Sequence, residues 1–176
     1  MMRNAIRPVA MALAISLSTP VLAQTTETVA THSDWAVVVA GDPKECYIVS
    51  QPTKSVARRG GSTVDVRRGD IRLFVSFRPN ENIANEISFT GGYPFKSGQA
   101  VKLEIGGRTF NMSPGTGAGA EWAWTSVSDD ASAVAALRAG ATATVTGVST
   151  RGTTTIDDFS LIGFTAAVTD AEARCK

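Results

Sequence analysis

Histidine and cysteine are scarce in this sequence, with one histidine and two cysteines among 176 residues. That count excludes a zinc site built from several histidine or cysteine ligands. A Ser-His-Asp triad would have to use His32, and no G-x-S-x-G motif supplies the nucleophile. Residues 115–120 fit the spacing G-x-G-x-x-A, but a predicted strand follows them instead of a helix, so we interpret them as a glycine-rich loop. The sequence therefore predicts no metal site, no cofactor and no catalytic residues.

Long apolar runs are missing beyond the N-terminus, since no stretch after residue 23 approaches the roughly 18 residues that a membrane-spanning helix needs. At the N-terminus, Arg3 and Arg7 precede an apolar run over residues 9–22, and Val21-Leu22-Ala23 offers a small-residue cleavage site. This layout is typical of a secretory signal peptide. We expect a mature protein without a transmembrane span that is periplasmic, associated with the outer membrane, or secreted.

Neither sign of charge dominates, with 17 basic and 16 acidic residues in the chain. Removal of residues 1–23 takes away Arg3 and Arg7 and leaves the mature chain with a formal net charge of −1. Such a balance gives no general attraction to nucleic acid, so we expect no nucleic-acid partner.

Basic residues nevertheless gather in one stretch, where six arginines fall within 21 positions. On adjacent strands they would form a local positive face for a phosphate, an acidic glycan or lipopolysaccharide. The alternative is a solvated sheet face whose charges protect its edge. The candidate partner-binding residues are Arg58, Arg59, Arg67, Arg68, Asp70, Arg72 and Arg78.

Two short motifs suggest other functions. Arg68-Gly69-Asp70 is an RGD tripeptide, which serves integrin adhesion when a loop tip displays it, although a plain turn between strands needs no adhesive role. The pairs Asp129-Asp130 and Asp157-Asp158 are candidates for a periplasmic hydrolase that acts on an envelope polymer through two carboxylates. The first pair also suits a helix N-terminus, and the second could form an ion pair with Arg151 across a tight turn.

Most of the mature chain consists of short β-like runs separated by turn residues. Residues 71–77 alternate between two faces, and Gly106-Gly107 predicts a tight hairpin between two alternating runs. One helix is predicted from Ser128, as N-cap, to Gly140. A second helix over residues 164–174 follows from the spacing of Phe164, Ala167, Val168 and Ala171. Together these runs predict an all-β antiparallel sandwich with one or two short peripheral helices.

We expect three segments along the chain: a signal peptide over residues 1–23, a polar flexible leader over residues 24–33, and a single domain over residues 34–176. Cys46 and Cys175 form an even pair in a predicted oxidising compartment, which favours a disulfide. That bond would tie the C-terminal helix to an early strand.

Six short blocks of sequence, spread over most of the mature chain, follow one another in a characteristic order. They are Asp34-Trp35-Ala36-Val37, Cys46-Tyr47-Ile48, Gly92-Tyr93-Pro94-Phe95, a helix end at residues 136–140, and the segments 149–153 and 159–167. In this order they resemble the invasion-associated locus B family of envelope proteins from Gram-negative, mainly alphaproteobacterial, bacteria. Many members carry additional cysteines in the central region, and this chain has only the outer pair.

The resemblance implies a secreted, immunoglobulin-like β-sandwich that is periplasmic or outer-membrane-associated and linked by its name to host-cell invasion. It supplies no established catalytic residues to carry over. We therefore expect a non-enzymatic protein that binds an envelope or host protein or glycan, with the hydrolase and the RGD-type adhesin as alternatives. The sequence names neither the partner nor the oligomeric state.

Overall fold

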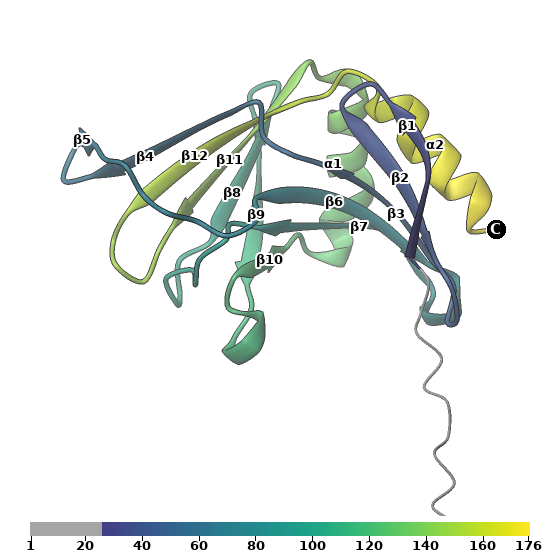
Figure 1. Ribbon diagram of the computed structural model, residues 1–176, viewed down its shortest axis with the longest axis horizontal. Coiled ribbons are helices and arrows are strands. Elements are labelled where there is room, and N and C mark those ends of the chain that lie inside the picture. The colour runs from purple at the N-terminus through teal and green to yellow at the C-terminus, as the bar shows by residue number, and fades with distance from the viewer. Residues whose placement is uncertain (1–25) are drawn as a thin grey trace, which may run out of the picture.

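The computed structural model describes residues 26–176, so the predicted signal peptide lies outside the described residues. Over this part, the chain forms one twelve-stranded antiparallel sheet in the order β1-β2-β3-β6-β7-β10-β9-β8-β11-β12-β4-β5 (Figure 1). The short strand β10 joins the two halves of the sheet, because it pairs with β7 on one side and β9 on the other. Two α-helices and two 3-10 turns complete the fold.

The first half of the sheet contains β1 (Thr26–His32), β2 (Trp35–Ala40), β3 (Glu45–Ser50), β6 (Arg72–Arg78), β7 (Ile83–Thr90) and β10 (Trp122–Trp124). The second half contains β9 (Arg108–Pro114), β8 (Val101–Ile105), β11 (Thr142–Val148), β12 (Thr154–Ser160), β4 (Lys54–Arg59) and β5 (Ser62–Thr63). The helices are α1 (Val127–Ala139) and α2 (Phe164–Arg174), and the 3-10 turns are η1 (Pro79–Glu81) and η2 (Gly117–Gly119).

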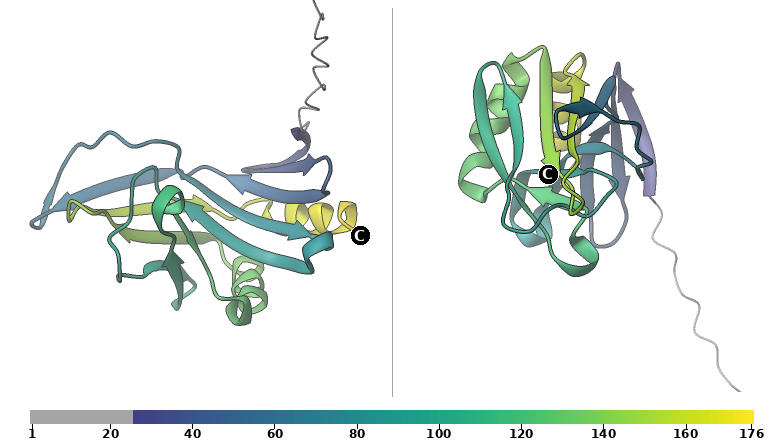
Figure 2. Two further views of the ribbon diagram at one scale, coloured as in Figure 1. Left: turned by 90° about the horizontal axis from the view of Figure 1, so that it is seen from below. Right: turned by 90° about the vertical axis from the view of Figure 1, so that its left-hand side faces the viewer.

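The two halves share one hydrophobic core, which confirms the predicted all-β sandwich (Figure 2). Trp35 and Leu73 from the first half, and Leu103 and Phe159 from the second, are fully buried in the same cluster. Trp35 links the halves directly, since its indole Nε1 donates to the Ser160 carbonyl at 3.0 Å.

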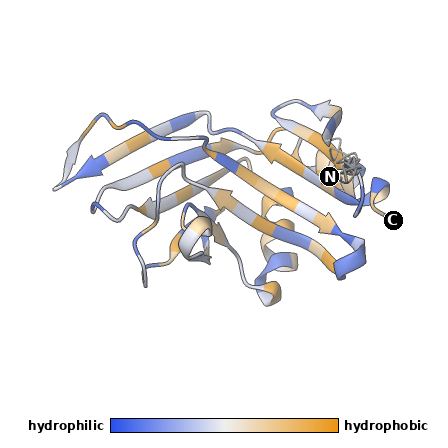
Figure 3. Cartoon of the chain, turned by 60° about the horizontal axis from the view of Figure 1, so that its bottom comes forward, coloured by the Kyte–Doolittle hydropathy of each residue, from blue (hydrophilic) through white to orange (hydrophobic). Residues whose placement is uncertain are grey.

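The strands alternate between apolar and polar positions along their length, as Figure 3 shows by hydropathy. In β6, Leu73, Val75 and Phe77 are buried, as their spacing predicts. The predicted hairpin at Gly106-Gly107 is confirmed between β8 and β9. Both glycines have positive φ, +55° and +80°, which a two-residue turn of this hand requires.

Both predicted helices form, with one difference at a boundary. In α2 the four predicted apolar residues are buried, and the helix ends immediately before Cys175. The first helix begins earlier than predicted, because Ser126 and not Ser128 is the N-cap of α1. The Asp129 and Asp130 amides both bond to the Ser126 carbonyl, and the Ser126 hydroxyl donates to Asp129 Oδ2 at 2.7 Å, so the first turn closes on Ser126.

The predicted flexible leader is wrong for residues 26–32, which form the edge strand β1 and pair with β2. A polar, threonine-rich strand can occupy a sheet edge because its backbone makes the ladder while few of its side chains need burial. His32 also contacts the last helix, with its Nε2 3.0 Å from Asp170 Oδ2. The described domain therefore includes residues 26–33.

The predicted disulfide between Cys46 and Cys175 is confirmed. Cys46 lies on β3 with its side chain in the core, and Cys175 follows the last turn of α2. The bond therefore fixes the C-terminal end of α2 against the first half of the sheet.

Candidate functional site

A buried ion pair joins a loop to the second half of the sheet. Arg68 reaches from the loop before β6 to Asp157 on β12, with Nη1–Oδ1 and Nη2–Oδ2 distances of 2.7 and 2.8 Å. Asp157 is fully buried and also accepts from the Ser55 hydroxyl at 2.7 Å. The remaining donor of the fork, Arg68 Nε, bonds to the Gly91 carbonyl at 2.8 Å. Each charge is thus met by specific hydrogen bonds, which a buried ion pair requires.

Tyr93 contacts the arginine of this ion pair. The Arg68 guanidinium lies 5.1 Å from the centre of the Tyr93 ring, a cation–π distance, and the phenol oxygen is 2.6 Å from the Thr155 hydroxyl. Burial raises the pKa of the Tyr93 phenol, so the ring is neutral at neutral pH.

A cleft of about 500 Å³ lies beside the ion pair, with Arg68 in its lining, and we call it the arginine cleft. It lies at the end of the sandwich where Figure 1 labels β4, β5 and β12. Its lining includes Arg59, Arg67, Arg68, Tyr93, Arg151 and Thr153. Arg59 donates from Nε and Nη2 to the Thr153 hydroxyl at 3.0 and 2.6 Å, while Arg67 and Arg151 are exposed at the mouth. Asp65 and Glu121 are the acidic residues in the lining.

The structure divides the predicted arginine set among several environments. Arg59, Arg67 and Arg68 line the arginine cleft, whereas Arg58 is exposed on β4 outside that lining. Arg72 and Arg78 lie on β6 in the other half of the sheet, where Arg72 contacts Asp70 at 3.5 Å. The six arginines therefore do not form one continuous face.

The sequence analysis missed Arg151 as a member of the cleft. Arg151 reaches it from the turn between β11 and β12, which a long-range pairing holds beside residues 92–95: the Thr150 amide donates to the Pro94 carbonyl at 3.0 Å, and Phe95 forms a β-bridge with Ser149. The signal that could have found it is that residues 92–95 and 149–153 both belong to the blocks that resemble the family.

The RGD tripeptide is not displayed as a unit. The Arg68 side chain is only 8% exposed because it binds Asp157, whereas Asp70 is 79% exposed. Between them, the Gly69 amide donates to the Gly92 carbonyl at 2.9 Å, which holds the turn against the neighbouring loop. An integrin-type ligand needs both charged ends accessible, so this geometry argues against the adhesin alternative.

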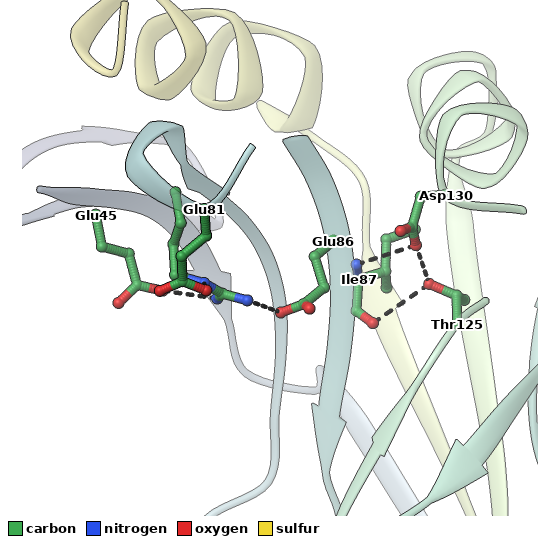
Figure 4. Close-up of polar contacts among 7 residues, drawn as sticks. Glu45, Glu81, Glu86, Ile87, Thr125 and Asp130 are labelled. Carbon is green, nitrogen blue, oxygen red and sulfur yellow. Dashed lines mark hydrogen bonds and ion pairs between the residues drawn. The ribbon is translucent and has the colours of Figure 1, made fainter. Parts of the chain in front are cut away.

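The acidic pairs do not present two accessible carboxylates. The sequence left open an ion pair between the second of these pairs and Arg151, but Asp157 binds Arg68 and Asp158 accepts from the Thr144 hydroxyl at 2.7 Å. Asp130 is buried and accepts from the Thr125 hydroxyl and from the Ile87 amide, as Figure 4 shows. Burial raises the pKa of the Asp130 carboxyl. Glycoside hydrolysis requires two accessible carboxylates that flank a cleft, and these acidic pairs do not provide them.

Residues 26–176 contain neither a metal-binding cluster nor a helix that could span a membrane. No group of three or more His, Cys, Asp or Glu side chains there is placed to hold a metal ion. None of the helices in this range combines the length and the apolar character of a membrane span.

Comparison with known proteins finds a solved structure with a similar fold and a family model that matches the sequence. The crystal structure of invasion associated protein B from Bartonella henselae superposes with a TM-score of 0.56 at 17% identity, covering 85% of this chain and 97% of that chain. At this identity the likeness shows a shared fold. No match is found among curated proteins. The sequence model of the family described as "Invasion associated locus B (IalB) protein" matches residues 35–172, which is most of the chain. The chain therefore belongs to the invasion associated locus B family.

Proposed function

We propose that this protein is a non-enzymatic, extracytoplasmic member of its family that binds an anionic group of an envelope or host partner in the arginine cleft. The observation that carries this proposal is the composition of the cleft mouth. In the part of the chain that the structure describes, no carboxylate forms an ion pair with Arg59, Arg67 or Arg151. Their guanidinium groups therefore keep charged donors for a ligand.

The chemistry of the cleft suits a phosphate or a carboxylate. A guanidinium offers planar, forked donors that match the oxygens of either group. Because Asp157 neutralises Arg68, that residue orders the floor while Arg59, Arg67 and Arg151 supply the net positive charge. Asp65 and Glu121 oppose them, so we expect a ligand to bind through one localised anionic group that stays clear of these carboxylates.

The extracytoplasmic part of the proposal rests on two features. A disulfide between Cys46 and Cys175 is typical of an oxidising compartment. The predicted signal peptide at residues 1–23 gives a route to that compartment.

The test compares the wild-type protein with an Arg67→Ala/Arg151→Ala variant. The probe is the delipidated, phosphorylated core oligosaccharide of lipopolysaccharide, titrated by calorimetry, with the dephosphorylated form as the chemical control. Hydrogen bonds to charged groups contribute about 1.5–3 kcal/mol each, so we expect the double variant to bind roughly tenfold or more weakly. Arg58→Ala is the matched control, because Arg58 is exposed on the same strand as Arg59 but does not line the cleft.

A second experiment seeks the natural partner. The tagged protein is cross-linked in its native envelope and purified, and the captured molecules are identified by mass spectrometry. We expect a partner that the wild type and Arg58→Ala capture and that the double variant loses. Equal capture by all three proteins, or equal binding of the oligosaccharide by the wild type and the double variant, would contradict the proposal.

A further inference from the structure

A row of aromatic side chains lies on the outer face of the first half of the sheet. Tyr47 on β3, Phe74 on β6, and Trp122 and Trp124 on β10 are each half-buried. Their neighbours along these strands, such as Ile48, Leu73 and Ala123, are fully buried in the core, so the aromatic side chains occupy the opposite face. The outward face of a sandwich is normally polar, which makes four clustered rings there an unusual feature.

The rings contact one another in sequence from β3 to β10, and the row passes over β7, which lies between β6 and β10 and contributes Ser88 to the groove. Centroid distances are 5.8 Å from Tyr47 to Phe74, 5.4 Å from Phe74 to Trp122, and 6.2 Å from Trp122 to Trp124. The two indoles are nearly parallel, with an interplanar angle of 21°. The row is therefore a continuous apolar surface, and not four isolated side chains.

The glycine-rich loop over residues 115–120 forms one wall of this surface. A Cβ atom on Gly115 would lie 2.5 Å from the Gly119 carbonyl oxygen and 3.0 Å from the Trp124 ring, so the loop can fold tightly over the indole only with glycine there. The segment with the spacing G-x-G-x-x-A thus builds a side wall of the surface. Together with the rings it encloses a groove of about 590 Å³, which we call the aromatic groove.

An acidic cluster adjoins the aromatic groove: Glu45, Glu86 and Arg78 line it, and Glu81 contacts Arg78 from outside the lining. Arg78 lies among three carboxylates, with distances of 3.2 Å from Nη1 to Glu45, 3.2 Å from Nε to Glu81 and 2.8 Å from Nη2 to Glu86. Figure 4 shows these three glutamates grouped around one centre. Three carboxylates share one guanidinium, so the cluster carries a formal charge of −2.

Glu45 and Glu81 are more exposed to solvent than the guanidinium that they contact, and Glu86 is exposed to nearly the same extent as Arg78. Side-chain exposure is 32% for Glu45, 54% for Glu81 and 24% for Glu86, against 23% for Arg78. On the same face, Arg72 is already in contact with Asp70. The aromatic groove therefore offers ring faces beside an unbalanced negative charge.

We propose that the aromatic groove binds a lysine- or arginine-bearing extended segment of a partner protein. Ring faces of Trp and Tyr attract cations, and the acidic cluster attracts them further, so both features select the same charge. The aliphatic stem of a lysine or arginine would cover the rings while its charged head reaches the carboxylates. A neutral glycan could stack on the rings but would gain nothing from the excess negative charge, which is why we place the cationic segment first.

This inference is independent of the arginine cleft, because the two surfaces have opposite charge and share no lining residue. The chain also provides its own reporter. Of its three tryptophans, Trp122 and Trp124 line the aromatic groove, while Trp35 is fully buried in the core. A change in tryptophan emission on ligand addition therefore reports occupation of the groove.

The experiment titrates the folded, disulfide-bonded protein with the peptide acetyl-Lys-Leu-Lys-Leu-Lys-amide. The same peptide with glutamate in place of lysine, and a tetramer of N-acetylglucosamine, serve as comparison probes. We expect a saturable change in tryptophan emission with the lysine peptide, which weakens as salt is added, and none with the glutamate peptide. Glu45→Gln/Glu81→Gln should bind the lysine peptide roughly threefold to tenfold more weakly, while Glu104→Gln, exposed on β8 in the other half of the sheet, should match the wild type.

Three outcomes would overturn the proposal. They are no saturable response to the lysine peptide, an equal response to both peptides, or a response to the sugar tetramer alone, which would assign the groove to neutral glycans. A Phe74→Ala variant guards against a misfolded double variant, since it removes the centre of the ring row and leaves every carboxylate in place. Arg67→Ala/Arg151→Ala should leave the lysine-peptide response unchanged, so failure of the cleft and failure of the groove are separable.

Discussion

At the scale of single residues, the arginine cleft depends on a charge that the fold buries completely. Asp157 sits on β12 opposite Ser55 of β4 and receives Arg68 from a loop. Removing one partner leaves the other charge buried without compensation, which costs about 3–5 kcal/mol.

We therefore expect Asp157→Ala to lower the free energy of unfolding by about 3–5 kcal/mol, measured by urea denaturation. Asp65→Ala is the control, since Asp65 is exposed at the rim of the same cleft and should change stability by less than about 0.5 kcal/mol. In a double-mutant cycle, Arg68→Ala/Asp157→Ala should cost clearly less than the sum of the single changes. Additive costs would show that the two side chains do not act as a pair.

Asp130 leads to a prediction about pH. Burial raises the pKa of its carboxyl in the folded state above the value of about 4 that it has in the unfolded chain. Between these two values the folded protein holds a proton that the unfolded chain has lost, so this group makes stability fall as pH rises through that window.

Asp130→Asn should remove this contribution while an amide oxygen still accepts from Thr125 and from the Ile87 amide. Relative to the wild type, the variant should gain stability as pH rises above about 4, as urea denaturation at several pH values would measure. Asp130→Ala lacks the acceptor and should lose about 1–3 kcal/mol at every pH. Parallel pH profiles for Asp130→Asn and the wild type would contradict this account.

The sequence could identify which residues of the cleft are charged but not how they pair. The possibility that the Asp157-Asp158 pair binds Arg151 rested on closeness in the chain, whereas the actual partner of Asp157, Arg68, lies 89 positions away. Only the packing of the loop before β6 against β12 brings these two together, and no local pattern encodes that approach. For the same reason, six arginines that are neighbours in sequence end up in two different halves of the sheet.

At the scale of elements, local sequence patterns predicted the elements whose conformation depends on residues close in the chain. The helical spacing in α2 and the glycine pair between β8 and β9 each specify one conformation, and both elements form as predicted. The edge strand β1 escaped prediction because its polar side chains carry no alternation signal. The pairing of β4 with β12 escaped it because about a hundred residues separate them, so the sheet order follows from the whole fold.

The attachment of α2 gives a prediction at this scale. Its C-terminal end is joined to β3 by the bond between Cys46 and Cys175, which closes a loop with a sequence separation of 129. In the chain-entropy model such a bond contributes about 4–5 kcal/mol. Reduction should therefore lower the melting temperature, and hydrogen exchange should speed up first in α2.

The control is a Cys46→Ala/Cys175→Ala variant, which should be less stable than the oxidised wild type and insensitive to reductant. If reductant lowers the melting temperature of both proteins equally, the effect does not come from the disulfide. An unchanged melting temperature of the reduced wild type would show that packing of Phe164, Ala167, Val168 and Ala171 holds the helix without help.

At the scale of the whole molecule, a nearly neutral chain separates its charges into two surfaces. The arginine cleft lies where β4 ends and β12 begins, and the aromatic groove lies on the outer face of β3, β6, β7 and β10. A formal net charge of −1 for residues 24–176 conceals this separation, because composition sums over charges that the fold places apart. The two surfaces meet at the start of β10, where Glu121 lines the cleft and Trp122 the groove.

This arrangement predicts that one protein molecule can hold an anionic and a cationic ligand at once. Beads carrying the lysine peptide should retain the wild-type protein, and the retained protein should then bind the phosphorylated oligosaccharide with the affinity that it shows in solution. Arg67→Ala/Arg151→Ala should stay on the beads but lose the oligosaccharide, and Glu45→Gln/Glu81→Gln should show the reverse. Release of the protein from the beads by the oligosaccharide would mean that the two ligands compete for one surface, because independent sites have no thermodynamic coupling.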